Sequence, residues 1–300
     1  MRHLMPLAYV DTIARAGSIR KAAETLAITS TALNRRVLGL EEELGVAIFE
    51  RLPRGVRLTT AGELLIAHIR GQMSDFEKVQ SQIADLAGER RGHVAIACSQ
   101  ALLPYFLPEQ IADYRAEHPA VTFSVSLRDR AAAEQALVDL SADIALIFEP
   151  VYLRDIQVLV SVPQTLHAVM APDHPLAGQK KVRIRDCADY PIGLPAAQYG
   201  VRHLLDLALK RSSVSLPVSV ESDSFEFLRC YPRREKLISF QIPIGLPETG
   251  SEGGVMSLPI DDRDMPAGTL YLCQLRGRAL PVAAAKFAGQ VERVLDERFG

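Results

Sequence analysis

The first residues of the chain carry apolar positions at helical spacing. Leu7, Val10 and Ala14 recur at steps of three and four, which predicts a helix over Leu4–Ala16. Gly17 is a typical helix stop, so we expect this first helix to end there.

Two further helices are expected before residue 46. Ser18 is placed to cap one over Ile19–Leu26, and Thr29 is placed to cap the next, which Gly45 ends. The apolar stripe of the later helix steps by four, three and four residues and consists of Leu33, Val37, Leu40 and Leu44.

Burial of that stripe turns a polar set toward the opposite face of the same helix. The set is Ser30, Thr31, Asn34 and Arg35, whose side chains suit contacts to base edges and phosphates. A solvated face is the commoner role of such residues, but the preceding helix stands at helix-turn-helix spacing. The pair of helices therefore favours sequence-specific binding of double-stranded DNA.

A basic hairpin is expected after the third helix. Val46–Arg51 and Val56–Thr59 read as short strands around a turn at Pro53–Gly55. This is the pattern of a wing, in which side chains facing the phosphate backbone give affinity and salt dependence. The basic residues of the predicted wing are Arg51, Arg54 and Arg57.

Residues 60–87 predict one long helix with an apolar seam at coiled-coil spacing. Packing on the same chain is the alternative, but the stripe is narrow, so we favour self-association of two chains. A dimer would present two recognition helices to two half-sites. The seam consists of Leu65, Ile69, Phe76, Val79, Ile83 and Leu86.

Beyond a polar hinge at 88–92 the pattern becomes an alternation of strands and helices, which predicts an α/β fold. Crossovers between two sets of elements are expected near Val160–Pro163 and Met265–Gly268. The first set comprises strands His93–Cys98, Val121–Leu127 and Asp143–Phe148 with helices over 104–117 and 131–141; Thr269–Gln274 and Pro281–Arg298 return to it. The second comprises strands Thr165–Met170, Tyr190–Leu194, Val218–Glu221 and Leu237–Ile242 with a helix over 200–211.

Ligands of open α/β sheets bind beyond the carboxyl ends of the strands. Each polar candidate there has a structural alternative, such as capping a helix or pairing with a neighbouring charge. Two arginines among them suggest the hypothesis of a small carboxylate ligand. The candidates are Ser99, Gln100, Arg128, Phe148, Gln198, Tyr199, Arg202 and Ser222, with Glu149, Asp223 and Ser224 nearby.

Composition narrows the class of protein further. Apolar residues make up 48% and charged residues 23%, as in globular proteins, and no apolar run is long enough to span a membrane. We therefore expect a cytoplasmic protein with no membrane partner. Residues 1–60 hold nine Lys and Arg against six Asp and Glu, a net charge of +3 that leaves −5 for the other 240 residues. A basic amino-terminal segment joined to an acidic remainder suits a domain that faces phosphates.

Neither a cofactor nor a metal is expected. The seven histidines and four cysteines show no metal-ligand spacing, and phosphate-loop, nucleophile-elbow and zinc-protease motifs are absent from the sequence. We therefore do not expect an enzyme. A transport-type solute-binding protein would leave the basic amino-terminal segment unexplained. The cysteines Cys98, Cys187, Cys230 and Cys273 read as reduced thiols.

The run SIRKAAETLAITSTALNRRVLGLEEELGVAIFERLPRGVRLTTAGE resembles the signature of LysR-type transcriptional regulators. The matching motifs are A-L-x-R, L-E-x-x-L-G, F-x-R and R-L-T-x-A-G. The chain departs from the family pattern at Leu38–Gly39, where a basic pair is common, and at Ser30–Thr31, where Gln-Pro is common. Its operator sequence is therefore expected to differ.

The resemblance implies a winged helix-turn-helix over 1–59, a linker helix over 60–88 and a periplasmic-binding-protein-like effector domain over 92–300. One lobe of that domain is expected at about 92–161 and 267–300, and the other at about 162–266. Dimers that pair into tetramers are implied, as is RNA polymerase as a partner if the protein is an activator. The implied DNA contacts are Thr29, Ser30, Thr31, Asn34 and Arg35 with Arg51 and Arg54, and the implied effector contacts begin with Ser99 and Gln100.

An alternative within this class replaces the small-molecule effector by oxidation of a thiol. Cys230 lies among Arg229, Arg233 and Arg234 in the sequence, and an electropositive setting is what a reactive cysteine needs. Cys187 is the other candidate sensor.

Overall fold

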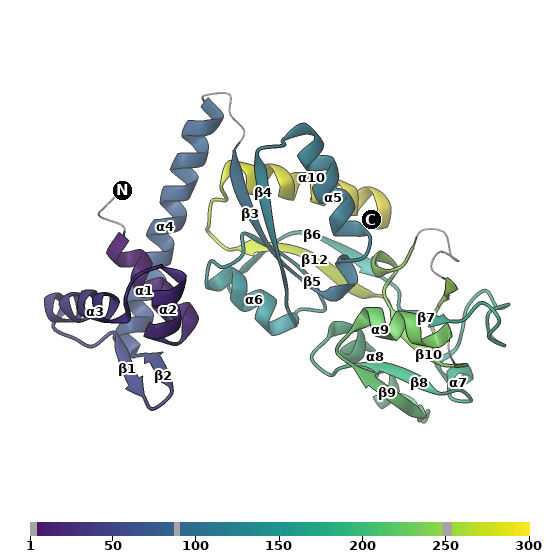
Figure 1. The fold of residues 1–300 in the computed structure, drawn as a ribbon. Coiled ribbons are helices and arrows are strands. Elements are labelled where there is room, and N and C mark those ends of the chain that lie inside the picture. Colours follow the sequence, from purple (N-terminus) through teal and green to yellow (C-terminus); the bar gives the residue numbers. More distant parts are fainter. Residues whose placement is uncertain (1–4, 87–90, 234, 248–253) are drawn as a thin grey trace. The chain divides into compact units, whose positions relative to one another are not determined.

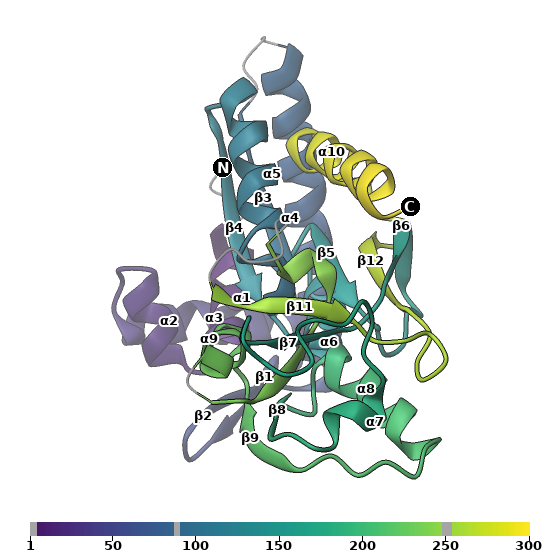
Figure 2. The same cartoon turned by 90° about the vertical axis from the view of Figure 1, so that its right-hand side faces the viewer.

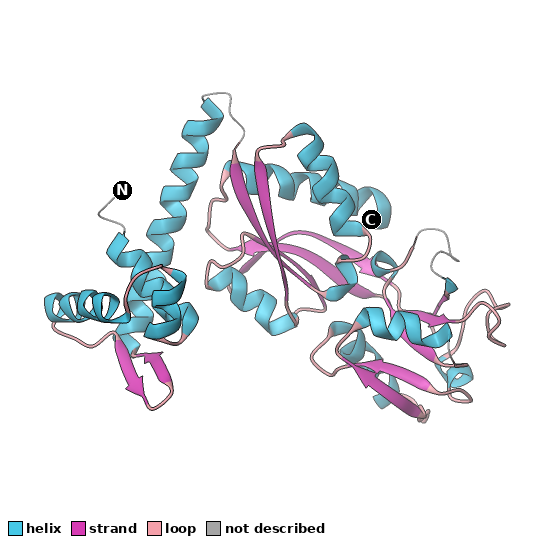
Figure 3. Ribbon diagram, viewed as in Figure 1, coloured by secondary structure: helices cyan, strands magenta, loops and turns pink. Residues whose placement is uncertain are grey.

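The computed structural model describes residues 5–86, 91–233, 235–247 and 254–300. The chain separates into two compact units, one ending at Gln80 and the other beginning at Ser81. Figure 1 labels their helices and strands, and Figure 3 shows the strands as a small hairpin and two larger sheets.

The first unit is a winged helix-turn-helix. The two predicted caps are confirmed: the Ser18 hydroxyl accepts from the Lys21 N–H, and the Thr29 hydroxyl accepts from the Ala32 N–H at 3.2 Å. Gly45 ends the third helix at φ +68°. The elements are α1 (Met5–Ala16), α2 (Ile19–Thr25), α3 (Ser30–Leu44), β1 (Phe49–Leu52), β2 (Gly55–Leu58) and the greater part of α4 (Thr60–Leu86), which continues into the second unit.

Two glycines let the hairpin pack closely on the helices. At Gly55, where φ is +113°, a Cβ would lie 2.3 Å from the carbonyl oxygen of Gly17, which accepts from the Val56 N–H at 2.9 Å. At Gly62 a Cβ would lie 2.1 Å from the carbonyl oxygen of Ile48. Any side chain at these positions would therefore push the hairpin off the α1–α2 turn or off the start of α4.

The second unit begins with a five-stranded sheet in the order β4-β3-β5-β12-β6, and we name this sheet with its helices lobe I. β3 pairs parallel with β4 and β5, whereas β12 runs antiparallel to β5 and β6. α5 and α10 cover one face and α6 the other (Figure 1). The elements are β3 (Gly92–Cys98), η1 (Gln100–Leu102), α5 (Phe106–Glu117), β4 (Val121–Leu127), α6 (Arg130–Val138), β5 (Ile144–Phe148), β6 (Ile156–Gln164), β12 (Gly268–Leu275) and α10 (Val282–Phe299).

A second five-stranded sheet, in the order β11-β7-β10-β8-β9, forms lobe II (Figure 2). β8 pairs parallel with β9 and β10, and β7 pairs antiparallel with β10 and β11. The elements are β7 (His167–Met170), α7 (Ile184–Cys187), β8 (Ile192–Pro195), α8 (Gly200–Lys210), β9 (Val218–Ser222), α9 (Phe225–Cys230), η2 (Tyr231–Arg233), β10 (Ile238–Gln241), η3 (Pro243–Gly245) and β11 (Met256–Pro259).

The passage between the lobes differs in detail from the sequence prediction. Val160–Pro163, expected as a crossover, lies inside β6, which pairs with β12 up to Gln164. The chain enters lobe II only between Gln164 and His167. Among the helices that the structure describes, none has the length and apolar character needed to cross a membrane.

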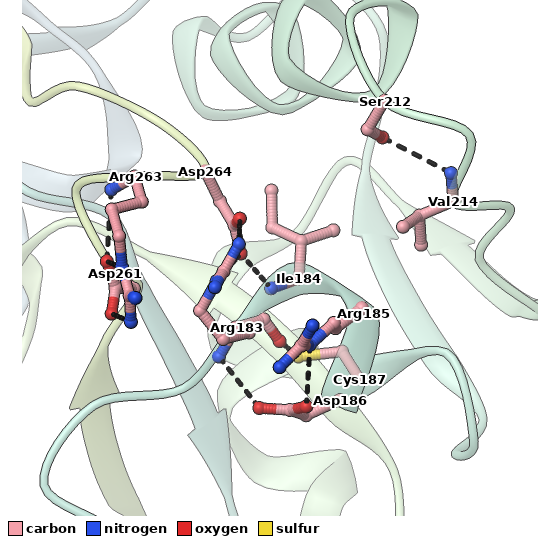
Figure 4. Close-up of polar contacts among 10 residues, drawn as sticks. All are labelled: Arg183, Ile184, Arg185, Asp186, Cys187, Ser212, Val214, Asp261, Arg263 and Asp264. Carbon is pink, nitrogen blue, oxygen red and sulfur yellow. Dashed lines mark hydrogen bonds and ion pairs between the residues drawn. The ribbon is translucent and has the colours of Figure 1, made fainter.

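An ion pair fixes the segment that returns from lobe II to lobe I (Figure 4). The guanidinium of Arg183 donates to both carboxylate oxygens of Asp264, and the Ile184 N–H donates to Asp264 Oδ2 at 2.7 Å. The hydrogen bond from Arg183 lowers the pKa of Asp264. A charged carboxylate thus holds the loop just before the return at Met265–Gly268.

Candidate nucleic-acid interface and interlobe cleft

The predicted DNA-reading residues share the outer face at the start of α3. Thr29, Ser30, Thr31 and Arg35 are exposed and Asn34 is half-buried. Burial of Leu33 and Val37 on the other side of the helix enforces this orientation. Short polar side chains and one guanidinium at the amino end of a helix suit contacts in a major groove.

A hydrogen bond ties the wing to this helix. Arg51 Nη2 of β1 donates to Asn34 Oδ1 at 2.8 Å, so a wing residue and a reading residue are linked directly. Arg54 is exposed at the turn between β1 and β2. Arg57, expected to face phosphate, pairs with Glu50 at 2.6 Å, and this contact competes with a phosphate for its guanidinium.

Two positioning residues were not singled out by the sequence analysis. Glu41 Oε1 accepts from the backbone N–H groups of Ile48 and Phe49, at 2.7 and 3.1 Å, and so anchors the start of β1 to α3. The Thr59 hydroxyl donates to the Ala47 carbonyl at 2.7 Å and accepts from the Gly62 N–H at 3.0 Å. Glu41 lies in the motif L-E-x-x-L-G and Thr59 lies in R-L-T-x-A-G, so these motifs were the sequence signal that could have identified the two residues.

The predicted dimerisation seam of α4 divides into two parts. Ile69 is fully enclosed by the core of the winged helix, so the expectation of an intermolecular role is wrong for this residue, whereas Leu65 is half-buried and packs partly against the same core. Farther along, Val79, Ile83 and Leu86 are 47%, 61% and 89% exposed, and Phe76 is half-buried. Among the residues of the predicted seam, the exposed ones therefore lie in the second half of the helix.

A cavity of about 10 Å³, enough for one water molecule, lies in the cleft between the lobes. Of the predicted effector contacts, Ser99, Arg128, Phe148 and Tyr199 line this cavity, whereas Gln100, Gln198, Arg202 and Ser222 do not. The remaining lining residues are Asp129, Arg130, Ala133, Leu146, Ile147, Gly200, Val201, Phe225 and Ile242.

Phe148 is buried beside the interlobe cavity. Its side chain is 2% exposed at the end of β5. A Cβ at Gly268 would lie 2.4 Å from its ring, and a Cβ at Gly200 would lie 2.3 Å from its carbonyl oxygen. Glycine at 200 lets α8 of lobe II approach the Phe148 backbone, and glycine at 268 leaves room for the Phe148 ring beside β12 of lobe I.

Gln100 of lobe I reaches across to lobe II. Its Nε2 donates to the Tyr199 hydroxyl at 2.9 Å and to the Asp223 carbonyl, and its Oε1 accepts from the Phe225 N–H at 2.9 Å. Every polar atom of this predicted effector contact is therefore engaged by the chain itself.

The other predicted contacts have local partners. Ser99 caps η1 by accepting from the Ala101 N–H, and the Ser222 hydroxyl accepts from the Ser224 N–H at 3.0 Å. Arg128 is exposed and donates to the Leu127 carbonyl at 3.3 Å, and Gln198 is exposed.

Arg202 does not join Arg128 at the cavity, which corrects the predicted pair. Its guanidinium donates to Asp206 at 2.9 Å and to Glu221 at 3.0 Å, both within lobe II. The positive charge of this guanidinium is already balanced by two carboxylates, so Arg202 adds no attraction for a carboxylate ligand in the cleft.

The cysteines are poorly placed for oxidation sensing. Burial raises the pKa of Cys98, Cys187 and Cys273 to about 12. The pKa of Cys230 is also raised, by burial and by Glu226, whose carboxylate accepts a hydrogen bond from the thiol at 3.2 Å. Because the thiolate is the reactive form, this geometry opposes the reactivity that the neighbouring arginines suggested.

A winged helix-turn-helix joined to a two-lobed α/β domain with an interlobe cleft defines a class of regulators that bind DNA and respond to a ligand. Residues 4–63 match the bacterial regulatory helix-turn-helix proteins of the lysR family, and residues 87–296 match the LysR substrate binding domain. The chain belongs to the LysR family. It is a DNA-binding transcriptional regulator with an effector-binding domain.

Individual proteins are similar over most of the chain. The HTH-type transcriptional activator CmpR of Synechocystis sp. is 25% identical over 217 residues, which are 72% of this chain and 71% of that protein. A full-length OxyR variant from Pseudomonas aeruginosa has the same fold, with a TM-score of 0.71 and 22% identity over 96% of this chain and 97% of that one. Full-length CbnR complexed with its target DNA also shares the fold, with a TM-score of 0.63 and 16% identity over 97% and 99% of the two chains.

Proposed function

We propose that this regulator reads its operator through the amino-terminal part of α3 and through its wing. The observation that carries the proposal is the common exposed face of Thr29, Ser30, Thr31 and Arg35, joined to Arg51 of the wing through Asn34. The helix supplies contacts to base edges, and Arg51 and Arg54 supply contacts to phosphates. Its site of action is then the cytoplasm, where chromosomal DNA lies, and its role is regulatory rather than catalytic.

The decisive experiment measures binding of the purified chain to the DNA upstream of its own gene by fluorescence anisotropy across a salt series. Arg35→Ala is compared with Arg293→Ala, which removes the same charge from an exposed position on α10. Loss of selective binding in the first variant alone supports the proposal. Equal binding by both variants and the wild-type chain would reject the assignment of α3.

We further propose that a small molecule entering the interlobe cleft changes promoter activity. The four predicted contacts that line the cavity support this placement, and the engaged Arg202 makes a carboxylate effector a weaker choice than the sequence suggested. Calorimetric titration with a panel of carboxylate and uncharged metabolites tests this point. Binding by carboxylates alone would restore the original hypothesis.

Self-association through the second half of α4 completes the proposal. The exposed residues Val79, Ile83 and Leu86 supply an apolar surface that a second chain would bury. Sedimentation of Ile83→Asp should show a smaller assembly than Gln82→Asp, which places the same charge on an exposed polar neighbour. If both variants keep the wild-type mass, α4 is not the interface.

A further inference from the structure

Gln100 satisfies three different polar groups of lobe II with one side-chain amide. The Phe225 N–H is a donor and the Asp223 carbonyl is an acceptor, so the roles of the two backbone groups are fixed. They require Oε1 toward Phe225 and Nε2 toward Asp223, as observed. The Tyr199 hydroxyl receives the second hydrogen of the same amide at 2.9 Å.

We infer that lobe II carries a binding site for a primary carboxamide and that Gln100 occupies this site from within the same chain. The inference rests on the proposed response to a small molecule, and it names the chemistry of the ligand that exchanges with Gln100. Among common groups, a primary carboxamide combines one acceptor with two donor hydrogens on a planar frame. A carboxylate offers no donor to the Asp223 carbonyl, and an ammonium offers no acceptor to the Phe225 N–H.

The surroundings of the amide are those of a built site. Tyr199 is buried, and its ring packs edge-on against Phe225 at a centroid distance of 5.1 Å, which fixes the hydroxyl. Ser99, Tyr199 and Phe225 also line the interlobe cavity, so the amide position is continuous with the cleft. A ligand with a carboxamide at one end would therefore replace Gln100 and extend toward Phe148.

The test uses the full chain and empties the site by Gln100→Ala. Gln179→Ala is the matched control, because Gln179 is exposed in lobe II. Amide hydrogen exchange is followed in the segment that contains Phe225, with acetamide or sodium acetate added at equal concentration and ionic strength. We expect faster exchange at Phe225 in Gln100→Ala only, and recovery of protection with millimolar acetamide but not with acetate.

Calorimetry gives an independent measure of the same exchange. The unfolding midpoint of the second unit should fall by about 3 °C in Gln100→Ala and rise again with acetamide. Adding Tyr199→Phe to that variant removes one hydrogen bond to the bound amide and should weaken the apparent acetamide affinity by about fivefold. Equal effects of acetamide and acetate, or unchanged exchange at Phe225 in Gln100→Ala, would overturn the inference.

The outcomes separate this site from the proposed function. Rescue of Gln100→Ala by acetamide alongside failed operator binding by the wild-type chain would leave the carboxamide site standing and reject the DNA assignment. Intact operator binding alongside no rescue would retain the assignment of α3 and reject the carboxamide site.

Discussion

Arg51 Nη2 lies 2.8 Å from Asn34 Oδ1, which links the wing to the recognition helix through one hydrogen bond. Asn34 therefore has two possible roles, as a reader of a base and as a support for Arg51. The roles are separable because one concerns sequence selectivity and the other concerns the placement of a positive charge.

Arg51→Ala should weaken operator binding by about tenfold, lower the salt slope by about 1 and affect all DNA sequences alike. Asn34→Ala should weaken binding to the operator more than binding to random DNA. It should leave the salt dependence of binding largely unchanged. Anisotropy titrations against both DNAs at several salt concentrations measure this difference. A uniform loss in Asn34→Ala would show that it serves only to support Arg51.

Glu41→Ala should destabilise the first unit by about 1–3 kcal/mol, because the Ile48 and Phe49 N–H groups lose their acceptor. Glu42→Ala, at an exposed position of the same helix, should change stability by less than about 0.5 kcal/mol. Urea unfolding measures both. Equal stabilities of the two variants would show that water replaces the carboxylate.

Phe148→Ala should cost about 3–5 kcal/mol of effector-domain stability, because it removes a ring that is 2% exposed. Phe148→Leu retains most of the volume and should cost about 1–2 kcal/mol. The alanine variant should also bind small apolar molecules such as benzene in the enlarged cavity, detectable as a rise in the unfolding midpoint. Absence of that rise would mean that the lobes collapse into the space.

Asp264→Asn should reduce stability at neutral pH and make it less sensitive to acid. The pKa of Asp264 is lowered in the folded chain by the hydrogen bond from Arg183, so its stabilising effect is complete above the unfolded value near 3.9. That effect is lost as the pH falls through the lowered folded value. The gap between the unfolding midpoints of the variant and the wild type should therefore narrow as the pH falls from 7 to 3, and a constant gap would contradict this origin.

Glu226→Gln should speed alkylation of Cys230 by iodoacetamide at pH 8. The carboxylate accepts a hydrogen bond from the thiol at 3.2 Å and helps to raise the pKa of Cys230, so its neutralisation increases the thiolate fraction. Mass spectrometry of the labelled peptide measures the rate. An unchanged rate would leave burial as the controlling factor, and a rapid wild-type rate would revive the oxidation-sensing alternative.

Local patterns predicted the first unit closely because its signals are short-range. Ser18 and Thr29 cap the helices that they were expected to cap, and Leu33 and Val37 face the core. The strands β6 and β11 were missed because each is defined by pairing with a distant partner, as Gln164 pairs with Gly268. Periodicity reports which face is buried, whereas pairing across a hundred residues depends on the assembled sheet.

In the candidate sites, too, features set by one local segment were predictable, whereas features set by contacts between distant segments were not. Arg35 and its neighbours follow from one helix and its stripe, so their exposure was predictable. The engagement of Arg202 by Asp206 and Glu221, or of Gln100 by Tyr199, depends on where separate loops meet in space. A polar residue after a strand identifies the right end of the sheet, but its sequence position does not reveal which partner has already taken its hydrogen bonds.

The tethered amide of Gln100 has a kinetic and thermodynamic consequence for signalling. A group held on a short flexible connection competes as though it were present at an effective concentration on the order of millimolar. An external ligand must therefore compete with the Gln100 amide for the site. Its apparent affinity equals the intrinsic affinity multiplied by the fraction of time that Gln100 leaves the site empty. This intramolecular competition raises the effector concentration that is needed for a response. The regulator would therefore respond to abundant effector and not to trace amounts.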